Sequence, residues 1–212
     1  MKAFPKKFSA RGLPLPVPDI DTDRIVPARF LGRSRRDDLG EACFYDFRRD
    51  AYGQLEPNCT LNMPRFSDAQ ILIAGANFGC GSSREMAVWA LMASSPASGW
   101  HGVRAILAPS FGDIFAANAR NNGLLLAGVT THTLQELSDT ALAVADLEIT
   151  LDLEARTVAW SGRSEPFVCD DFTRRCLLEG LDDISITLQY EHLIREHECQ
   201  VRMSRLSTSP QR

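Results

Sequence analysis

The residues of this chain best suited to chemistry are two adjacent serines followed by an arginine and a glutamate, Ser82 to Glu85. A guanidinium presents a planar fork of N–H donors that matches a carboxylate or a phosphate. A serine hydroxyl needs a stabilising positive field before its ionised form can act as a base. The spacing is also that of a capping box, with Ser82 as the N-cap and Glu85 three residues later. The pattern predicts an anion site at the beginning of a helix.

The flanking segments are those that build such a site in α/β proteins. Apolar residues 71–74 predict a buried strand, and residues 77–81 form a turn with two glycines. No charged residue occurs in residues 86–100, so the body of the helix is expected to be buried. Unpaired amides and the helix dipole would place positive charge at its first turn. On spacing alone, a well-capped structural helix with a solvated arginine remains an alternative.

Length and composition limit the class of protein. The 212 residues, 44% of them hydrophobic, predict one domain over residues 1–200 and a disordered tail over 201–212. The 23 basic and 27 acidic residues leave a net charge of −4, which argues against nucleic acid as a partner. No apolar run of export-signal or membrane-spanning length is present, so we expect a cytoplasmic protein without a membrane partner.

The six cysteines form no CxxC pair, and their spacing matches no zinc or iron–sulfur ligand pattern. They are therefore expected to be reduced thiols, and no metal site is predicted on this chain. Cys80 lies in the glycine turn, where its pKa could fall before a helix. The alternative is a small residue that fills a tight turn. His192 and His197 are five residues apart and do not share a helix face.

Two charged loops precede the central segment. Residues 19–23 contain three aspartates, which fits either a solvated turn or the polar edge of an active site. Residues 29–36 contain four arginines around Gly32. This basic loop could close over an anionic ligand, or it could be an exposed loop paired with Asp37 and Asp38.

The rest of the chain predicts an α/β fold. Strands are expected at residues 103–108 and 124–129, joined by a helix capped by Ser110 and ending near Asn121-Asn122-Gly123. This order requires a partly parallel sheet. Alternating residues 147–153 predict a half-buried strand, with residues 157–160 as its hairpin partner. Further helices are expected from Asp170 or Asp171 to Gly180, and over residues 184–197.

Four motifs in this order carry a family resemblance over about residues 8–197. They are DTDRIVPARFL at 21–31, NFGCGSSRE at 77–85, APSFGDIFAANARNNGLL at 108–125 and DDFTRRCLLEGLDDISITLQ at 170–189. The chain resembles the small subunits of 3-isopropylmalate dehydratase, which are relatives of the swivelling domain of aconitase. The resemblance implies a compact β/β/α swivel-like domain with a mixed, partly parallel sheet.

The resemblance also implies a function. It implies a hydro-lyase of leucine biosynthesis that moves the hydroxyl of an isopropylmalate between adjacent carbons through an alkene diacid. A large-subunit partner would carry a 4Fe–4S cluster, whose iron acts as a Lewis acid on the departing hydroxyl. This chain would bind no cofactor and would be inactive alone. Its small-molecule ligand would be a hydroxy diacid.

The family's functional residues map onto the motifs. The resemblance implies that Arg84 binds a substrate carboxylate and that Ser82 is the base. It places Ser83 and Gly81 in substrate binding, with Thr22 and Asp23 supporting the same cleft. The loop over residues 30–36 corresponds to the family's substrate-discriminating loop, where Arg33 is the expected contact.

Two departures bear on the substrate. The family usually reads SSREHAPWAL, whereas this chain has Met86 in place of the histidine, and methionine neither titrates nor donates a hydrogen bond. Residues 92–101 also form a longer segment than is usual. A dehydratase for a methylmalate or dimethylmalate therefore remains an alternative, as does a non-catalytic anion-binding module.

Overall fold

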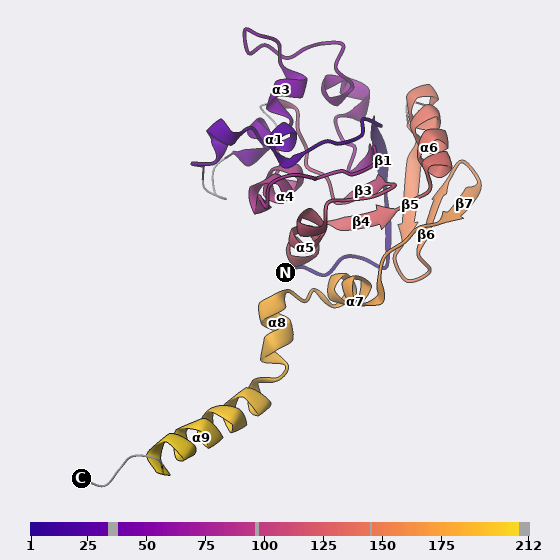
Figure 1. Cartoon of the computed structure of the whole chain (residues 1–212). Helices are drawn as coiled ribbons and strands as arrows, with labels where there is room; N and C mark the ends of the chain where they lie inside the picture. Colours follow the sequence, from indigo (N-terminus) through magenta and orange to yellow (C-terminus); the bar gives the residue numbers. More distant parts are fainter. Residues whose placement is uncertain (34–37, 96–97, 145, 208–212) are drawn as a thin grey trace.

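The computed structural model describes residues 1–33, 38–95, 98–144 and 146–207, with side chains through Val201. Within these residues the body is an α/β domain around one seven-stranded sheet, in the order β4-β3-β2-β1-β5-β6-β7 (Figure 1). The strands are β1 (Lys7–Leu15), β2 (Ile71–Ala74), β3 (Ala105–Ala108), β4 (Leu125–Gly128), β5 (Glu148–Asp152), β6 (Thr157–Trp160) and β7 (Arg163–Pro166). The mixed sheet confirms the predicted fold class.

Strand β1 divides the sheet into a parallel half and an antiparallel half. In the parallel half, β1 pairs with β2, β2 with β3 and β3 with β4. All side chains of β2 and β3 are buried, as is typical of parallel strands covered on both faces. The crossovers are α4 (Glu85–Met92) and α5 (Asp113–Asn122), which confirms the predicted strand–helix–strand–helix–strand order.

The antiparallel half consists of β5, β6 and β7 beyond β1. In β5 the buried Ile149 and Leu151 alternate with more exposed residues, which confirms the half-buried strand predicted there. β6 is its predicted hairpin partner. β7 was not predicted, because its sequence RSEP is exposed throughout and has no apolar alternation.

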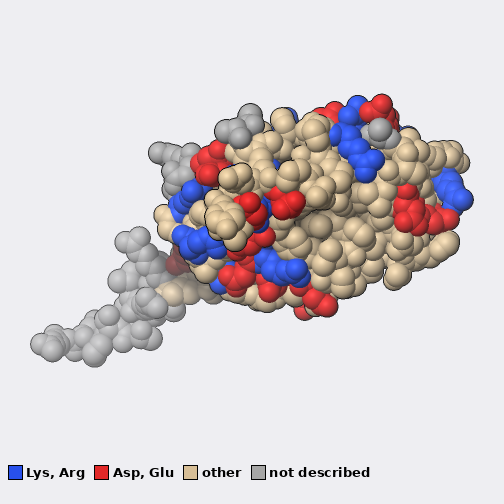
Figure 2. Space-filling view, turned by 90° about the horizontal axis from the view of Figure 1, so that it is seen from above, with Lys and Arg blue, Asp and Glu red and all other residues tan. Residues whose placement is uncertain are grey.

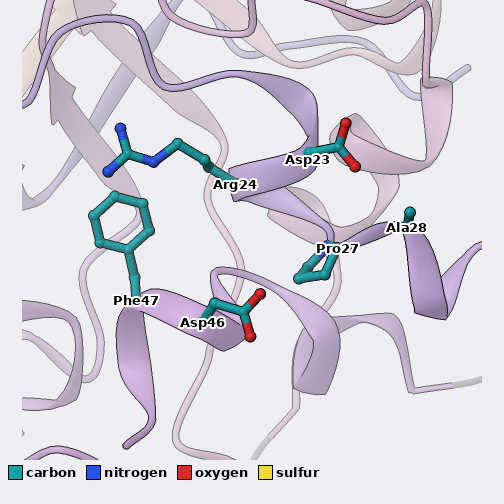
Figure 3. Close-up of a pocket in the computed structure, with 6 residues that line it drawn as sticks. All are labelled: Asp23, Arg24, Pro27, Ala28, Asp46 and Phe47. Atoms are coloured by element: carbon teal, nitrogen blue, oxygen red, sulfur yellow. The ribbon is translucent and has the colours of Figure 1, made fainter. Parts of the chain in front are cut away.

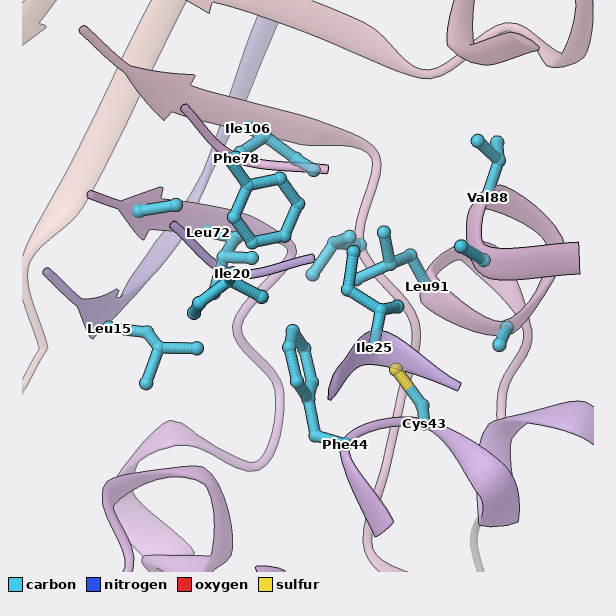
Figure 4. Packing of buried hydrophobic residues seen from close by; sticks show 14 of the residues in the cluster. Leu15, Ile20, Ile25, Cys43, Phe44, Leu72, Phe78, Val88, Leu91 and Ile106 are labelled. Atoms are coloured by element: carbon cyan, nitrogen blue, oxygen red, sulfur yellow. The ribbon is translucent and has the colours of Figure 1, made fainter. Parts of the chain in front are cut away.

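A hydrophobic core lies on each face of the sheet. The first core joins strand residues such as Leu72 and Ile106 to Phe44, Phe78 and Leu91 (Figure 4). The second core takes the alternate strand residues and the inner face of α6 (Thr131–Ala143). Helix α6 was not predicted, although its buried positions 134, 137 and 141 have helical spacing.

Short helices of the N-terminal third form a layer over the first core. They are α1 (Thr22–Ile25), α2 (Leu39–Ala42) and α3 (Tyr45–Arg48), with 3₁₀ turns η1 (Ala28–Phe30), η2 (Thr60–Asn62) and η3 (Pro64–Phe66). Arg48 is only 2% exposed and donates to Asn62 Oδ1 at 2.9 Å and to the Ser98 carbonyl. These bonds hold the layer together. On the face seen from above, Lys and Arg side chains lie next to Asp and Glu (Figure 2).

The two ends of α5 test the predicted caps. Ser110 as the N-cap is wrong, because the helix begins at Asp113 after Gly112 and that N-cap makes no side-chain hydrogen bond. The Ser110 hydroxyl instead accepts the N–H of Asn77 at 2.9 Å. The predicted C-terminal stop is confirmed, because Gly123 adopts a left-handed φ of 81° that few other residues tolerate.

The chain leaves the body after α7 (Asp171–Glu179), which ends at Gly180 as predicted. The expected single final helix is two helices, α8 (Asp183–Leu188) and α9 (Glu191–Ser207), which extend away from the body (Figure 1). The expected tail begins within α9, and residues 208–212 lie outside the described residues. No helix in the described part of the chain is both long and apolar enough to span a bilayer.

Candidate active site

The bend that follows β2, residues 77–84 and hereafter the serine bend, adopts backbone conformations that most residues avoid. Asn77, Gly79 and Gly81 have φ values of 57°, 74° and 88°, in the left-handed region. A Cβ at Gly79 would lie 2.3 Å from the ring of Phe115, so this position requires glycine for space as well as for φ. The predicted glycine turn is confirmed.

Hydrogen bonds tie the serine bend to two neighbouring loops. Phe78 N–H donates to the Ser110 carbonyl at 3.1 Å, and Gly112 N–H donates to the Phe78 carbonyl at 2.9 Å. On the other side, Gly79 N–H donates to the Ile20 carbonyl at 2.7 Å. The bend is therefore held where parallel strands end, which is where open α/β sheets place ligands.

Thr22 fastens the loop over residues 19–23 to the serine bend. Its side chain is 1% exposed, and its hydroxyl donates to the Ser82 carbonyl at 3.0 Å. Its backbone N–H donates to the Cys80 carbonyl at 3.0 Å. Thr22 therefore holds the backbone on both sides of Gly81, and its hydroxyl is directed at the bend rather than at solvent.

The aspartates of the same loop have separate partners. Asp19 accepts from Asn77 Nδ2 at 2.8 Å. Asp21 is the N-cap of α1 and accepts the Arg24 N–H at 2.7 Å. The acidic loop is therefore not a freely solvated turn, because Asp19, Ile20 and Thr22 each bond the serine bend and Asp21 caps α1.

Arg84 and Asp23 form an ion pair at the edge of this assembly. Arg84 Nη1 donates to Asp23 Oδ1, and the two side chains are 20% and 51% exposed. The contact engages one terminal nitrogen of the guanidinium. A partly exposed arginine held by a carboxylate is oriented and still accessible to an anionic ligand.

The capping box predicted over residues 82–85 is wrong. Helix α4 begins at Glu85, with Arg84 as its N-cap and no side-chain capping bond. A tight turn closed by Arg84 N–H and the Ser82 carbonyl at 2.8 Å delays the helix. The Glu85 carboxylate instead accepts from Asn122 Nδ2 at 2.7 Å. The expected burial of the helix body is confirmed at residues 87, 88, 90 and 91.

Ser82 and Ser83 are exposed on the outside of the bend, as is Gly81. Within the described residues neither serine hydroxyl makes a hydrogen bond, so both are available to a ligand. The structure thus brings together Gly81, both serines, Arg84 and Asp23, with Thr22 behind them. This set offers one cation, one carboxylate and two hydroxyls, which suits a small hydroxy acid anion.

A cavity of about 370 Å³ opens beside Asp23 (Figure 3). It is lined by Asp23, Arg24, Pro27, Ala28, Asp46 and Phe47. The guanidinium of Arg24 lies 4.4 Å from the centre of the Phe47 ring, a favourable cation–π distance. Asp46 and Phe47 were not predicted as site residues; the aromatic residues at positions 44, 45 and 47 were the signal that could have indicated them.

Arg33 is held by residues outside the serine bend. Its Nη1 donates to Glu41 Oε2 at 3.0 Å and to the Asp38 carbonyl at 3.1 Å, and its guanidinium lies over Phe30. Residues 34–37, which contain the rest of the predicted basic loop, lie outside the described residues. The role expected for Arg33 stays a prediction.

Cys80 has a raised pKa. Burial raises it, and the negative charges of Asp21 and Asp19 raise it further, so the thiol is neutral near pH 7. The alternative in which the turn lowers this pKa is wrong, because the nearby carboxylates disfavour a thiolate. In the described part of the chain no group of three or more His, Cys, Asp or Glu side chains is arranged to hold a metal ion.

The fold and the serine bend define a class of protein. The family model described as the aconitase C-terminal domain matches residues 9–130, more than half of the chain. The crystal structure of 3-isopropylmalate dehydratase from Methanocaldococcus jannaschii has the same fold. It superposes with a TM-score of 0.59 at 23% identity, covering 91% of this chain and 99% of that one.

Sequence relatives narrow the class. The 3-isopropylmalate dehydratase small subunit of Francisella tularensis subsp. novicida (strain U112) is 40% identical over 198 residues, 93% of this chain and 97% of the relative. The corresponding subunit of Frankia alni is 43% identical over 198 residues, 93% of this chain and 94% of the relative. This chain belongs to the family of 3-isopropylmalate dehydratase small subunits.

Proposed function

We propose that this chain is the small subunit of a hydro-lyase that interconverts 2-isopropylmalate and 3-isopropylmalate by removing and returning water. The reaction is a step of leucine biosynthesis, and we place it in the cytoplasm. The observation that carries the proposal is the group of exposed Ser82 and Ser83 beside the ion-paired Arg84. The family membership of the chain supports the choice of substrate.

The chemistry of dehydration explains why these side chain types are needed. Removing a proton from the carbon next to a carboxylate builds negative charge on that carboxylate. Arg84 would bind it through the nitrogens that Asp23 does not engage, and a preorganised cation stabilises such charge. Ser82 would take the proton, with its ionised oxygen stabilised by the positive charge of the neighbouring Arg84. Ser83 and Gly81 would contact the substrate.

The proposed enzyme needs a second subunit. Within the described residues this chain lacks a set of side chains that could hold a 4Fe–4S cluster. Cys43, Cys169 and Cys176 are buried, and the Cys43 pKa is strongly raised by burial, which disfavours the thiolate that a cluster requires. The family resemblance is the reason for assigning the cluster to the large subunit, and the roles described above are those of this chain's own residues.

Met86, which replaces the histidine usual in the family, is accommodated by packing. Its side chain is partly buried against the first core, on the first turn of α4. The replacement of histidine by Met86 therefore changes the packing of the first core and leaves the exposed hydroxyls of the bend in place. The identity of 40–43% with 3-isopropylmalate dehydratase small subunits supports isopropylmalate as the substrate over a methylmalate or dimethylmalate.

The proposal is tested by combining purified small subunit with its large subunit under anaerobic conditions. The assembled enzyme would be given 3-isopropylmalate, methylmalate, dimethylmalate and citrate in parallel. We expect formation of the alkene diacid from 3-isopropylmalate with the highest kcat/KM, and no turnover by the small subunit alone.

A higher kcat/KM for one of the other three acids would overturn the substrate assignment. If the assembled complex has an intact cluster but turns over none of the four acids, the proposed hydro-lyase activity is wrong. Binding of these acids without turnover would then indicate an anion-binding module.

A further inference from the structure

Asn122, the last residue of α5, contacts two successive turns of α4. Its Nδ2 donates to Glu85 Oε1 at 2.7 Å and to the Asn118 carbonyl at 2.9 Å. Its Oδ1 accepts the indole N–H of Trp89 at 3.1 Å. Both amide hydrogens and the amide oxygen of this one side chain are therefore engaged.

The end of α5 holds the Asn122 side chain in place. Gly123 turns the chain out of the helix, and its N–H donates back to the Ala119 and Arg120 carbonyls. The bond from Asn122 to Asn118 orients the amide along the helix. Glu85 and Trp89 are four residues apart and so lie on the same face of α4. The Asn122 side-chain amide thus fixes the orientation of the α4 face that carries Glu85 and Trp89.

The contact with Glu85 matters because Glu85 directly follows Arg84. Arg84 is the N-cap of α4 and has no side-chain capping bond to fix the helix start. An unrestrained Glu85 carboxylate next to the guanidinium would compete with Asp23 and with an incoming anion. Asn122 keeps this carboxylate on the α5 side of the helix.

We infer that Asn122 is a positioning residue, which sets the first turn of α4 and thereby orients the Arg84 guanidinium towards the substrate carboxylate. The inference rests on the role proposed for Arg84 above. Asn122 itself does not contact the substrate. Asn122 acts on the reaction through the Glu85 carboxylate. Loss of the Asn122 amide hydrogens should therefore lower kcat/KM only when Arg84 is present.

The test uses Asn122→Asp in the assembled two-subunit enzyme with 3-isopropylmalate. This change keeps the size of the side chain but places a carboxylate against that of Glu85. We expect kcat/KM to fall about tenfold, mainly through a higher KM. Asn118→Asp is the matched control, because it makes the same change one turn earlier on α5. The Asn118 side chain has no hydrogen bond in the described residues, and its variant should keep kcat/KM.

Two further measurements separate positioning from a structural role. In an Arg84→Lys background, Asn122→Asp should cost less than about twofold, because the two changes act on the same contact. Pairing Asn122→Asp with Glu85→Gln restores a donor opposite the new carboxylate and should recover most of the lost kcat/KM. Melting temperature and co-purification with the large subunit are measured for every variant.

The inference is overturned if Asn122→Asp costs as much in the Arg84→Lys background as in the native enzyme, or if the Glu85→Gln pairing recovers nothing. A loss of kcat/KM that only follows a loss of folding or assembly also overturns it. If Arg84→Lys alone has no effect, the proposed role of Arg84 fails and the inference fails with it. If Arg84→Lys is damaging but the two changes add, the inference alone fails.

Discussion

In the parallel half of the sheet, β2 and β3 end in loops that meet one another, whereas in the antiparallel half β5, β6 and β7 are joined by tight turns. Parallel strands require crossovers, so their carboxyl ends lie at one edge and their loops converge. Hairpin strands point in alternate directions and their turns do not converge. All residues of the serine bend and its supporting loop therefore come from the parallel half.

The difference indicates that the two halves of the sheet have different functions. The parallel half positions the proposed chemistry, and the antiparallel half extends the second hydrophobic core through residues such as Ile149 and Leu151. Substitutions in the two halves should consequently differ in what they damage. Bend substitutions should reduce turnover without unfolding the protein, and substitutions in β5 should do the reverse.

The largest expected effect is that of Ser82→Ala, which should reduce kcat of the assembled enzyme by about a hundredfold or more, because a general base is lost. The melting temperature should stay within a degree or two, since Ser82 is exposed. Steady-state kinetics with 3-isopropylmalate measure the change, and Ser83→Ala, with a smaller loss, is the matched control. A near-native kcat in the Ser82→Ala enzyme would show that Ser82 is not the general base.

Ile149→Ala tests the antiparallel half. Ile149 is fully buried in β5 and packs over Gly12 of β1. Its truncation should lower the free energy of unfolding by about 2–5 kcal/mol, measured by urea denaturation of the small subunit. At a temperature where the variant is folded, kcat and KM of the assembled enzyme should be unchanged. A kinetic defect in the folded variant would show that the halves are not separable.

Arg84→Lys should reduce kcat/KM more than about tenfold, because lysine keeps the charge but lacks the planar fork that binds a carboxylate. Stability should change little, since the ion pair with Asp23 is partly exposed. Arg33→Lys is the comparison variant. It should cost less, because Arg33 is held by Glu41. Equal losses in the two variants would argue for closure of the basic loop over the substrate.

Thr22→Val should destabilise the protein by about 1–3 kcal/mol, because a buried hydroxyl that bonds the Ser82 carbonyl is lost. The freed bend should also lower kcat/KM several-fold. Thr22→Ser, which keeps the hydroxyl, should restore kinetics more fully than stability. Thermal melts and steady-state kinetics of the two variants measure these effects. Identical kinetic defects in the two variants would show that the Thr22 hydroxyl does not contribute to kcat/KM.

The smallest effect is expected for Cys80→Ser, within about twofold in kcat/KM. Burial and the neighbouring aspartates raise the Cys80 pKa, so the thiol stays protonated below its ordinary pKa and somewhat above it. The pH profile of kcat/KM should therefore keep its alkaline limb in the variant. A displaced limb would show that the thiol titrates in the reaction.

Local sequence patterns predicted those features whose causes are themselves local. The apolar run 71–74, the glycine turn and the stop at Gly123 each depend on burial or backbone freedom within a few residues. The alternation in β5 similarly reports a strand with one buried face. The family motifs pointed to the serine bend, because they contain the residues that make it up.

Prediction was wrong where side chains had a choice of partners. Glu85 had the spacing of a capping box, yet it bonds Asn122, which is 37 residues away in sequence. Ser110 had the spacing of an N-cap, yet it accepts the N–H of Asn77. A local pattern shows that a group can form a hydrogen bond, and not which of several partners it will meet.

The sequence by itself determined the succession of strands and helices over residues 71–129, the glycine turn and the chemical inventory of the bend, because periodicity, glycine conformation and side-chain chemistry are properties of short segments. Only the tertiary structure decided that Asp23 pairs with Arg84, that Thr22 holds the Ser82 carbonyl and that Arg33 is held by Glu41. Those contacts depend on how loops far apart in the chain converge at the edge of the sheet. Their geometry is set by the packing of the whole domain.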